Sequence, residues 1–116
     1  MSGMASVLAV AEHREGKVAG STYELVAKGR EVAAKAGGTL QVAVLGRGVS
    51  GLAAEVATRG VDVLHVEHEA LAAYTPGGYS QALTALQEKV DARVVLLAHT
   101  TQGYDLAPRL AAEWNA

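Results

Sequence analysis

The chain has 116 residues, of which half are apolar and 19% are charged, and its formal net charge is −2. Its near-neutral charge excludes the basic surface that nucleic acids select, and no apolar run approaches the roughly 20 residues of a membrane-spanning helix. Because cysteine is absent, disulfides and cysteine-ligated metals are excluded as well. We therefore expect residues 1–116 to form a single cytoplasmic domain that binds neither nucleic acid nor membrane.

The first part of the chain alternates apolar strands with a helix. Residues 5–11 (ASVLAVA) are a nearly continuous apolar run, which predicts a strand covered on both faces. After a turn at residues 13–17, Ser21 and Glu24 match a capping box, which predicts a helix that ends at a glycine pair. The next strand is predicted at residues 39–45.

The middle of the chain repeats this alternation. A helix is predicted from about Leu52 to Thr58, and a third strand at residues 61–66. Residues 69–73 are expected to form a helical turn and residues 74–78 a loop. A longer helix with an apolar stripe is predicted from about Tyr79 to Lys89.

The fourth strand is predicted at residues 93–98, and a last helix follows, with Asp105 as its cap and Pro108 in its first turn. Four strands that alternate with helices predict a three-layer α/β/α domain with a mostly parallel sheet of at least four strands. We expect the strand order 3-2-1-4, because the doubly wound pattern reverses direction beside its first strand.

One glycine motif lies between the second strand and its helix. Residues 46–51 (GRGVSG) match GxGxxG, the context in which glycine amides approach a pyrophosphate at a helix N-terminus. The fingerprint normally follows the first strand of a sheet, however, and Glu67 or Glu69 matches the expected ribose-binding acid only loosely. A tight structural turn is therefore favoured, and nucleotide binding is the alternative.

Two histidines are the best ligand candidates. His13 and His99 follow the first and fourth strands, so the order 3-2-1-4 predicts that both lie at the crevice where open α/β sheets bind ligands. Glu12 and Asp105 lie nearby in sequence and would complete an acid–base or metal set. The competing interpretation is that these are ordinary polar loop residues.

Other candidates are weaker. His65 and His68 are three apart in an extended segment, so their side chains point to opposite faces and we expect surface histidines. Residues 100–104 (TTQGY) resemble an anion-binding loop before a helix, although a connection of this length is also ordinary. We assign no residue a catalytic, cofactor-binding or metal-binding role.

The order and spacing of several segments resemble the N-terminal domain of the alpha subunit of electron transfer flavoprotein. These segments are VLAVAEH, GKV, ELVAKGREVAAKAGG, LQVAVLG and GVDVLHVEHEALAAY, together with VVLLAHTTQGYDLAPRLAAEW, which is the most similar. The resemblance implies a Rossmann-like fold of the adenine nucleotide alpha hydrolase-like type that docks on a beta-type subunit. In the full-length family FAD is held mainly by a C-terminal domain that these residues do not include, so we expect no cofactor bound by this chain alone.

The resemblance thus implies a non-catalytic scaffolding and subunit-docking domain of a flavin-dependent electron carrier, and not an enzyme. The alternative is a small nucleotide-binding α/β protein that uses the Gly46–Gly51 loop or the crevice between His13 and His99. A fragment of a longer subunit and a naturally short relative both stay open. Because the fourth strand is apolar and forms an edge in the order 3-2-1-4, we also expect a homodimer through this strand.

Overall fold

The computed structural model of the protein describes residues 6–116. Its elements, in chain order, are β1 (Ser6–Val10), β2 (His13–Arg14), β3 (Lys17–Val18), α1 (Gly20–Ala36), β4 (Thr39–Gly46), α2 (Ser50–Ala57), β5 (Asp62–Glu67), the 3₁₀ helix η1 (Glu69–Leu71), α3 (Pro76–Val90), β6 (Val94–Leu96) and α4 (Thr101–Trp114). Ala5, expected as the first residue of the first strand, lies outside the described residues. No helix within residues 6–116 is both long and apolar enough to cross a membrane.

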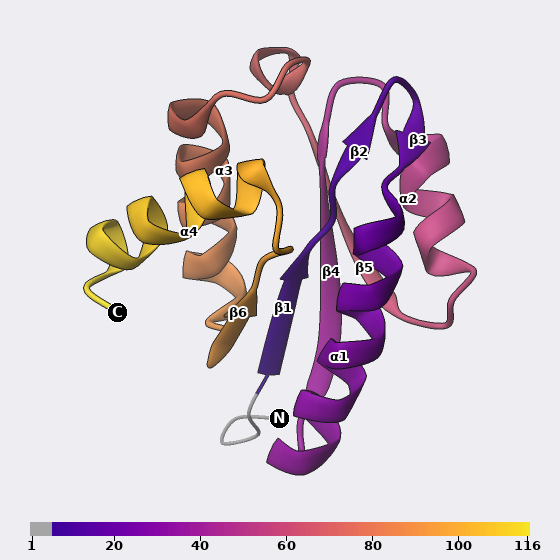
Figure 1. The fold of residues 1–116 in the computed structure, drawn as a ribbon, viewed down its shortest axis with the longest axis vertical. Coiled ribbons are helices and arrows are strands. Elements are labelled where there is room, and N and C mark those ends of the chain that lie inside the picture. The colour runs from indigo at the N-terminus through magenta and orange to yellow at the C-terminus, as the bar shows by residue number, and fades with distance from the viewer. Residues whose placement is uncertain (1–5) are drawn as a thin grey trace.

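Four strands form one sheet in the order β5-β4-β1-β6, and all three neighbouring pairs are parallel (Figure 1). Counted along the chain, these strands have the order 3-2-1-4, so the predicted topology is confirmed. The segment predicted only as a turn forms a small antiparallel hairpin of β2 and β3. Its two turn residues, Glu15 and Gly16, have φ values of 52° and 76°, which suit the type I′ turn that matches strand twist.

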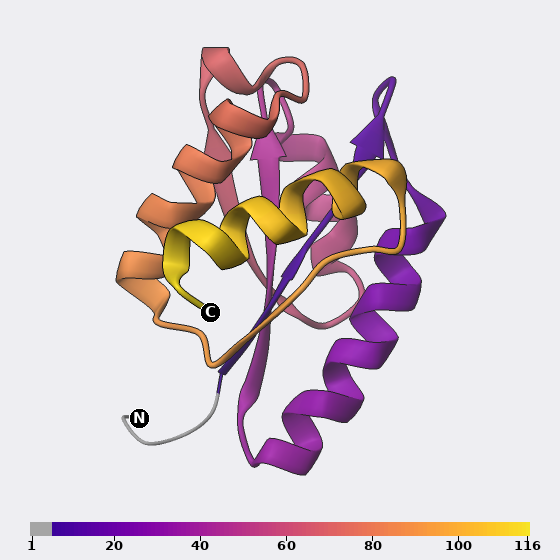
Figure 2. The same ribbon diagram turned by 60° about the vertical axis from the view of Figure 1, so that its left-hand side comes forward.

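Helices cover both faces of the sheet because side chains alternate along each central strand. Leu8 and Leu45 point into a core with Leu83, Leu106 and other residues of α3 and α4. Ala9, Val42 and Val44 point into a second core with residues of α1 and α2. Figure 2 shows α3 and α4 on one side of the strands and α1 on the other, which confirms the three-layer α/β/α class.

All four α-helices begin earlier than the sequence predicted, and α2 does so by two residues, at Ser50. α1 begins at Gly20 after Ala19, so the capping box at Ser21 was wrong. α3 begins at Pro76, and the Thr75 hydroxyl accepts a hydrogen bond from the Gly78 amide at 3.1 Å, where the sequence predicted a loop. Proline is favourable at the first helical position because its missing N–H would be unpaired there, and this outweighed the two glycines that follow.

The cap of the last helix was also predicted at the wrong residue. Thr100 caps α4, and its hydroxyl accepts from the Gly103 amide at 3.1 Å, while Asp105 lies inside the helix. Pro108 is therefore in the helix interior and not in the first turn. A proline there leaves the carbonyl of Tyr104, four residues earlier, without its helical donor.

The start of α4 approaches the end of β6 so closely that only glycine fits at position 103. A Cβ atom on Gly103 would lie 1.8 Å from the carbonyl oxygen of Ala98, so the backbone would have to move. We predict that Gly103→Ala destabilises the protein by about 1–3 kcal/mol, measured as the change in urea unfolding midpoint at a fixed protein concentration.

Gly51 supplies a matched control because it is also helical and has open space around its Cβ position. Gly51→Ala is expected to stabilise the protein by about 0.5–1 kcal/mol through the better helix propensity of alanine. Equal unfolding midpoints for the two variants would contradict the close approach at Gly103.

Candidate functional site

A cleft of about 670 Å³ opens at the carboxyl ends of the central strands. Its lining residues come from the β2–β3 hairpin and the segments beside it, the segment after η1 and the start of α4. Figure 1 shows where the hairpin and α4 lie in the fold. Its lining residues are Glu12, His13, Arg14, Glu15, Ala19, Ser21, Ala72, Tyr74, Tyr79, Thr100, Thr101 and Gln102. This is the edge at which open α/β sheets usually bind ligands, and it includes the start of the loop at residues 100–104.

Glu12 connects three elements at the base of the cleft. Its carboxylate oxygen Oε2 accepts from the Thr100 hydroxyl at 2.7 Å. Its backbone N–H donates to the hydroxyl of Thr22, and that hydroxyl donates to the Glu12 carbonyl, both at 2.9 Å. Thr22 is buried, so these bonds pair a hydroxyl that would otherwise be desolvated without a partner. Glu12 thus ties the starts of α1 and α4 to the end of β1.

His13 and Tyr79 converge on one backbone oxygen. The His13 Nε2 donates to the Leu45 carbonyl at 2.6 Å, and the Tyr79 hydroxyl donates to the same oxygen at 3.2 Å. Burial raises the pKa of Tyr79, which keeps its hydroxyl protonated as a donor. A second tyrosine, Tyr74, packs edge-on against Tyr79 with ring centres 4.9 Å apart.

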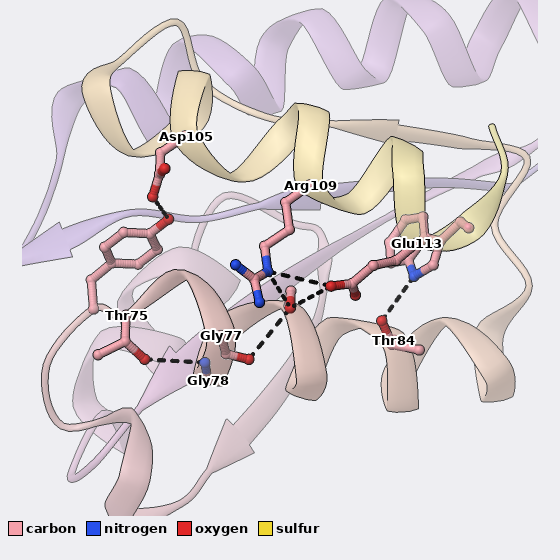
Figure 3. Close-up of polar contacts among 10 residues, drawn as sticks. Thr75, Gly77, Gly78, Thr84, Asp105, Arg109 and Glu113 are labelled. Atoms are coloured by element: carbon pink, nitrogen blue, oxygen red, sulfur yellow. Dashed lines mark hydrogen bonds and ion pairs between the residues drawn. The ribbon is translucent and has the colours of Figure 1, made fainter.

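Asp105 does not join Glu12 and His13 in an acid–base set. Its carboxylate Oδ2 accepts from the Tyr74 hydroxyl at 2.7 Å (Figure 3). Burial, and then the hydrogen bond to Asp105, raise the pKa of Tyr74 far above its ordinary value. The pair joins the segment before α3 to the first half of α4.

His99 lies away from the lining of the cleft. Its exposed ring packs edge-on against Tyr104, with ring centres 4.7 Å apart. Tyr104 is 63% exposed, so this aromatic pair is a surface feature. The structure therefore places His13 in the cleft and His99 on the surface beside the start of α4.

The glycine motif at residues 46–51 holds a carboxylate from the protein itself. Glu67 accepts from the amides of Gly48 and Val49 at the start of α2, and its Oε1 accepts from His65 Nε2 at 2.9 Å. The bond from Gly48, followed by the bond from His65, lowers the pKa of Glu67. The carboxylate thus occupies the position where a pyrophosphate would be expected to meet the helix N-terminus.

The local structure explains why two positions of this motif are glycine. Gly46 has no room for a Cβ atom, which would lie 2.6 Å from Val49 Cγ1 and 3.2 Å from the His13 ring. Gly48 has a φ of 68°, in the left-handed region. The motif therefore meets the needs of a tight turn without any ligand.

The remaining histidine is also engaged locally, because His68 Nδ1 accepts from the Ala70 amide at 2.9 Å as the cap of η1. Among residues 6–116, no three histidine, aspartate or glutamate side chains lie together as a metal ion would require.

A second polar cluster, which the sequence did not predict, joins α3 to α4 beside a shallow cleft of about 410 Å³. Arg109 Nε donates to the buried Ser80 hydroxyl at 3.2 Å and pairs with Glu113 at 3.3 Å (Figure 3). Trp114 Nε1 donates to the Thr84 hydroxyl at 2.8 Å. In the sequence, the only indication of this cluster is that Arg109 and Glu113 are four residues apart, the spacing at which side chains on one helix form an ion pair.

The sequence matches the family described as Electron transfer flavoprotein domain over residues 7–116. It is 35% identical over 107 residues to the electron transfer flavoprotein subunit alpha of Bacillus subtilis, covering 91% of this chain and 32% of the relative. It is 35% identical over 102 residues to the acryloyl-CoA reductase electron transfer subunit beta of Anaerotignum propionicum, covering 87% and 28%. It is 32% identical over 105 residues to the lactate dehydrogenase (NAD(+),ferredoxin) subunit LctC of Acetobacterium woodii, covering 90% and 25%.

The chain spans about a third or less of the length of these relatives. The family match nevertheless covers nearly all the described residues, and it agrees with the parallel sheet and the two helical layers. The resemblance found from the sequence segments is confirmed: the chain belongs to the electron transfer flavoprotein domain family.

Proposed function

We propose that this chain is a scaffolding and subunit-docking domain of a flavin-dependent electron carrier, and that it has no catalytic site of its own. The family match over residues 7–116 carries this proposal. The cleft supports it, because the side chains expected to act on a ligand are bonded to one another and to the backbone. A cytoplasmic location remains part of the proposal.

A beta-type subunit is the partner that we propose. Tyr104 supplies a candidate anchor, because it is exposed, aromatic and braced by His99 at the start of α4. Tyrosine is among the residues that most often dominate binding energy at protein interfaces. We therefore propose that the beta-type subunit contacts the surface formed by His99 and Tyr104.

We predict that the purified chain binds the beta-type subunit of its own organism, measured by isothermal titration calorimetry. Tyr104→Ser should weaken this binding by about 2 kcal/mol, or roughly 30-fold in Kd, because it removes the aromatic anchor. Tyr23→Ser is the matched control, since Tyr23 lies on α1 against Arg59 and its loss should leave Kd unchanged.

The possible outcomes distinguish the proposed docking function from the proposed contact surface at His99 and Tyr104. Absence of binding by the unaltered chain would contradict the docking function. Binding that Tyr104→Ser leaves intact would contradict the contact surface only.

We predict that the chain alone holds no FAD. Purified protein mixed with FAD should emerge colourless from gel filtration, because Glu12, His13 and Thr100 of its cleft are already paired within the domain. A complete electron transfer flavoprotein treated in the same way is the positive control. A yellow chromophore that elutes with this chain in stoichiometric amount would overturn the proposal.

The alternative function, nucleotide binding at residues 46–51, has a separate test. We predict that AMP, ATP and NAD leave Tm unchanged, because the Glu67 carboxylate already accepts from the amides that a phosphate would need. A ligand at a hundredfold excess over its Kd would stabilise the fold by about 2.7 kcal/mol, which a thermal melt detects. A rise in Tm that Gly48→Val abolishes, in a variant that still folds, would instead favour the nucleotide-binding protein.

A further inference from the structure

Helix α4 carries one backbone acceptor that has no helical donor. In an α-helix the carbonyl of each residue accepts a hydrogen bond from the amide four residues later. Pro108 lies inside α4, four residues after Tyr104, and proline has no N–H to donate. The missing bond of the Tyr104 carbonyl is therefore a property of the helix itself.

This acceptor lies on the part of α4 that also carries the exposed tyrosine ring. Tyr104 and Pro108 are four residues apart, so they are neighbours on one flank of the helix. Both residues are exposed. Ala107 and Ala111 lie on the same flank and have only methyl side chains, which leaves room for another protein to approach the carbonyl.

The charged side chains of the same stretch of α4 lie on a different flank. Figure 3 shows Asp105 and Arg109 on the side of α4 that faces α3. Asp105 accepts from Tyr74, and Arg109 donates to Ser80. Both are thus engaged by other segments of the domain, away from the flank of Tyr104.

Docking at Tyr104 places a demand on the partner. Water can pair with the Tyr104 carbonyl while this flank is exposed, but a protein that covers the flank displaces that water. Buried backbone carbonyls are almost always hydrogen-bonded, because an unpaired acceptor away from water costs free energy. Since residue 108 cannot supply the donor, the covering protein must supply it.

We propose that the beta-type subunit donates an N–H of a cationic side chain, arginine or lysine, to the carbonyl of Tyr104. A charged donor makes a stronger hydrogen bond than a neutral one, and the face of the neighbouring tyrosine ring attracts cations. The bond rests on the docking function proposed above and specifies the chemistry of one contact in it.

Pro108→Ala tests this bond, because alanine returns the N–H that pairs with the Tyr104 carbonyl inside the helix. The variant should have a higher Tm than the unaltered chain, since proline is unfavourable in a helix interior. Its Kd for the beta-type subunit, measured by isothermal titration calorimetry, should nevertheless rise about 10-fold, the effect of losing one hydrogen bond to a charged donor.

Two further variants serve as controls. Pro76→Ala removes the other proline of the chain, at the first position of α3, and should leave Kd unchanged. A variant with lactic acid at position 108 has the side chain of alanine but an ester oxygen in place of the N–H. It lacks the proline ring and still leaves the Tyr104 carbonyl without a helical donor, so its Kd should equal that of the unaltered chain.

The outcomes distinguish this bond from the docking function. Absence of binding by the unaltered chain would overturn both. If the unaltered chain binds, an unchanged Kd for Pro108→Ala would overturn the bond alone. Equal weakening by alanine and by lactic acid would do the same, because it would assign the effect to the shape of the proline ring.

Discussion

The structure depends on the burial of β1 and β4 on both of their faces. Val7, Leu8, Val42 and Ala43 are fully buried, and the two residues that follow in each strand are at most 2% exposed. In such strands the backbone groups must pair within the sheet, and a polar side chain has no solvent to face until the strand ends. Glu12 and the residues near it are therefore the first that can carry chemistry, which places the polar groups of the domain at the carboxyl edge.

The same burial explains why these polar groups bond to one another. The carboxylate of Glu12, the hydroxyl of Thr22 and the carbonyl of Leu45 all lie at the border of the apolar cores. Leaving such a group desolvated and unpaired costs about 1–3 kcal/mol. Each instead receives a partner from a different element, and the bonds fix where α1 and α4 begin. Glu12 and His13, which suggested a catalytic set in the sequence, therefore pair with groups of the domain itself and position its elements.

The topology could be predicted from the sequence because nearly continuous apolar runs indicate strands that are buried on both faces, as in a parallel sheet covered by helices. It was not sufficient for the helix starts, because several residues able to cap lie near each one. Thr100 and Asp105 are both good caps in isolation, and tertiary contacts decide between them: Thr100 is held by Glu12, 88 positions away, and Asp105 is taken by Tyr74, 31 positions away.

The glycine motif shows a similar limit. Its pattern predicted a tight turn, and Glu67 was noted only as a weak match to a ribose-binding acid. The parallel register sets Glu67 beside Gly46, which brings its carboxylate to the amides of the turn. Sequence spacing alone does not contain that register, so the role of Glu67 required the neighbouring strand in place.

Glu12, His13 and Tyr79 are paired within the domain, whereas Tyr104 offers exposed aromatic surface at the start of α4. A side chain at such a place can change without altering the packing of either core, because it belongs to neither of them. The surface of the domain is therefore freer to differ than its sheet among relatives that are named as subunits of an electron transfer flavoprotein, an acryloyl-CoA reductase and a lactate dehydrogenase.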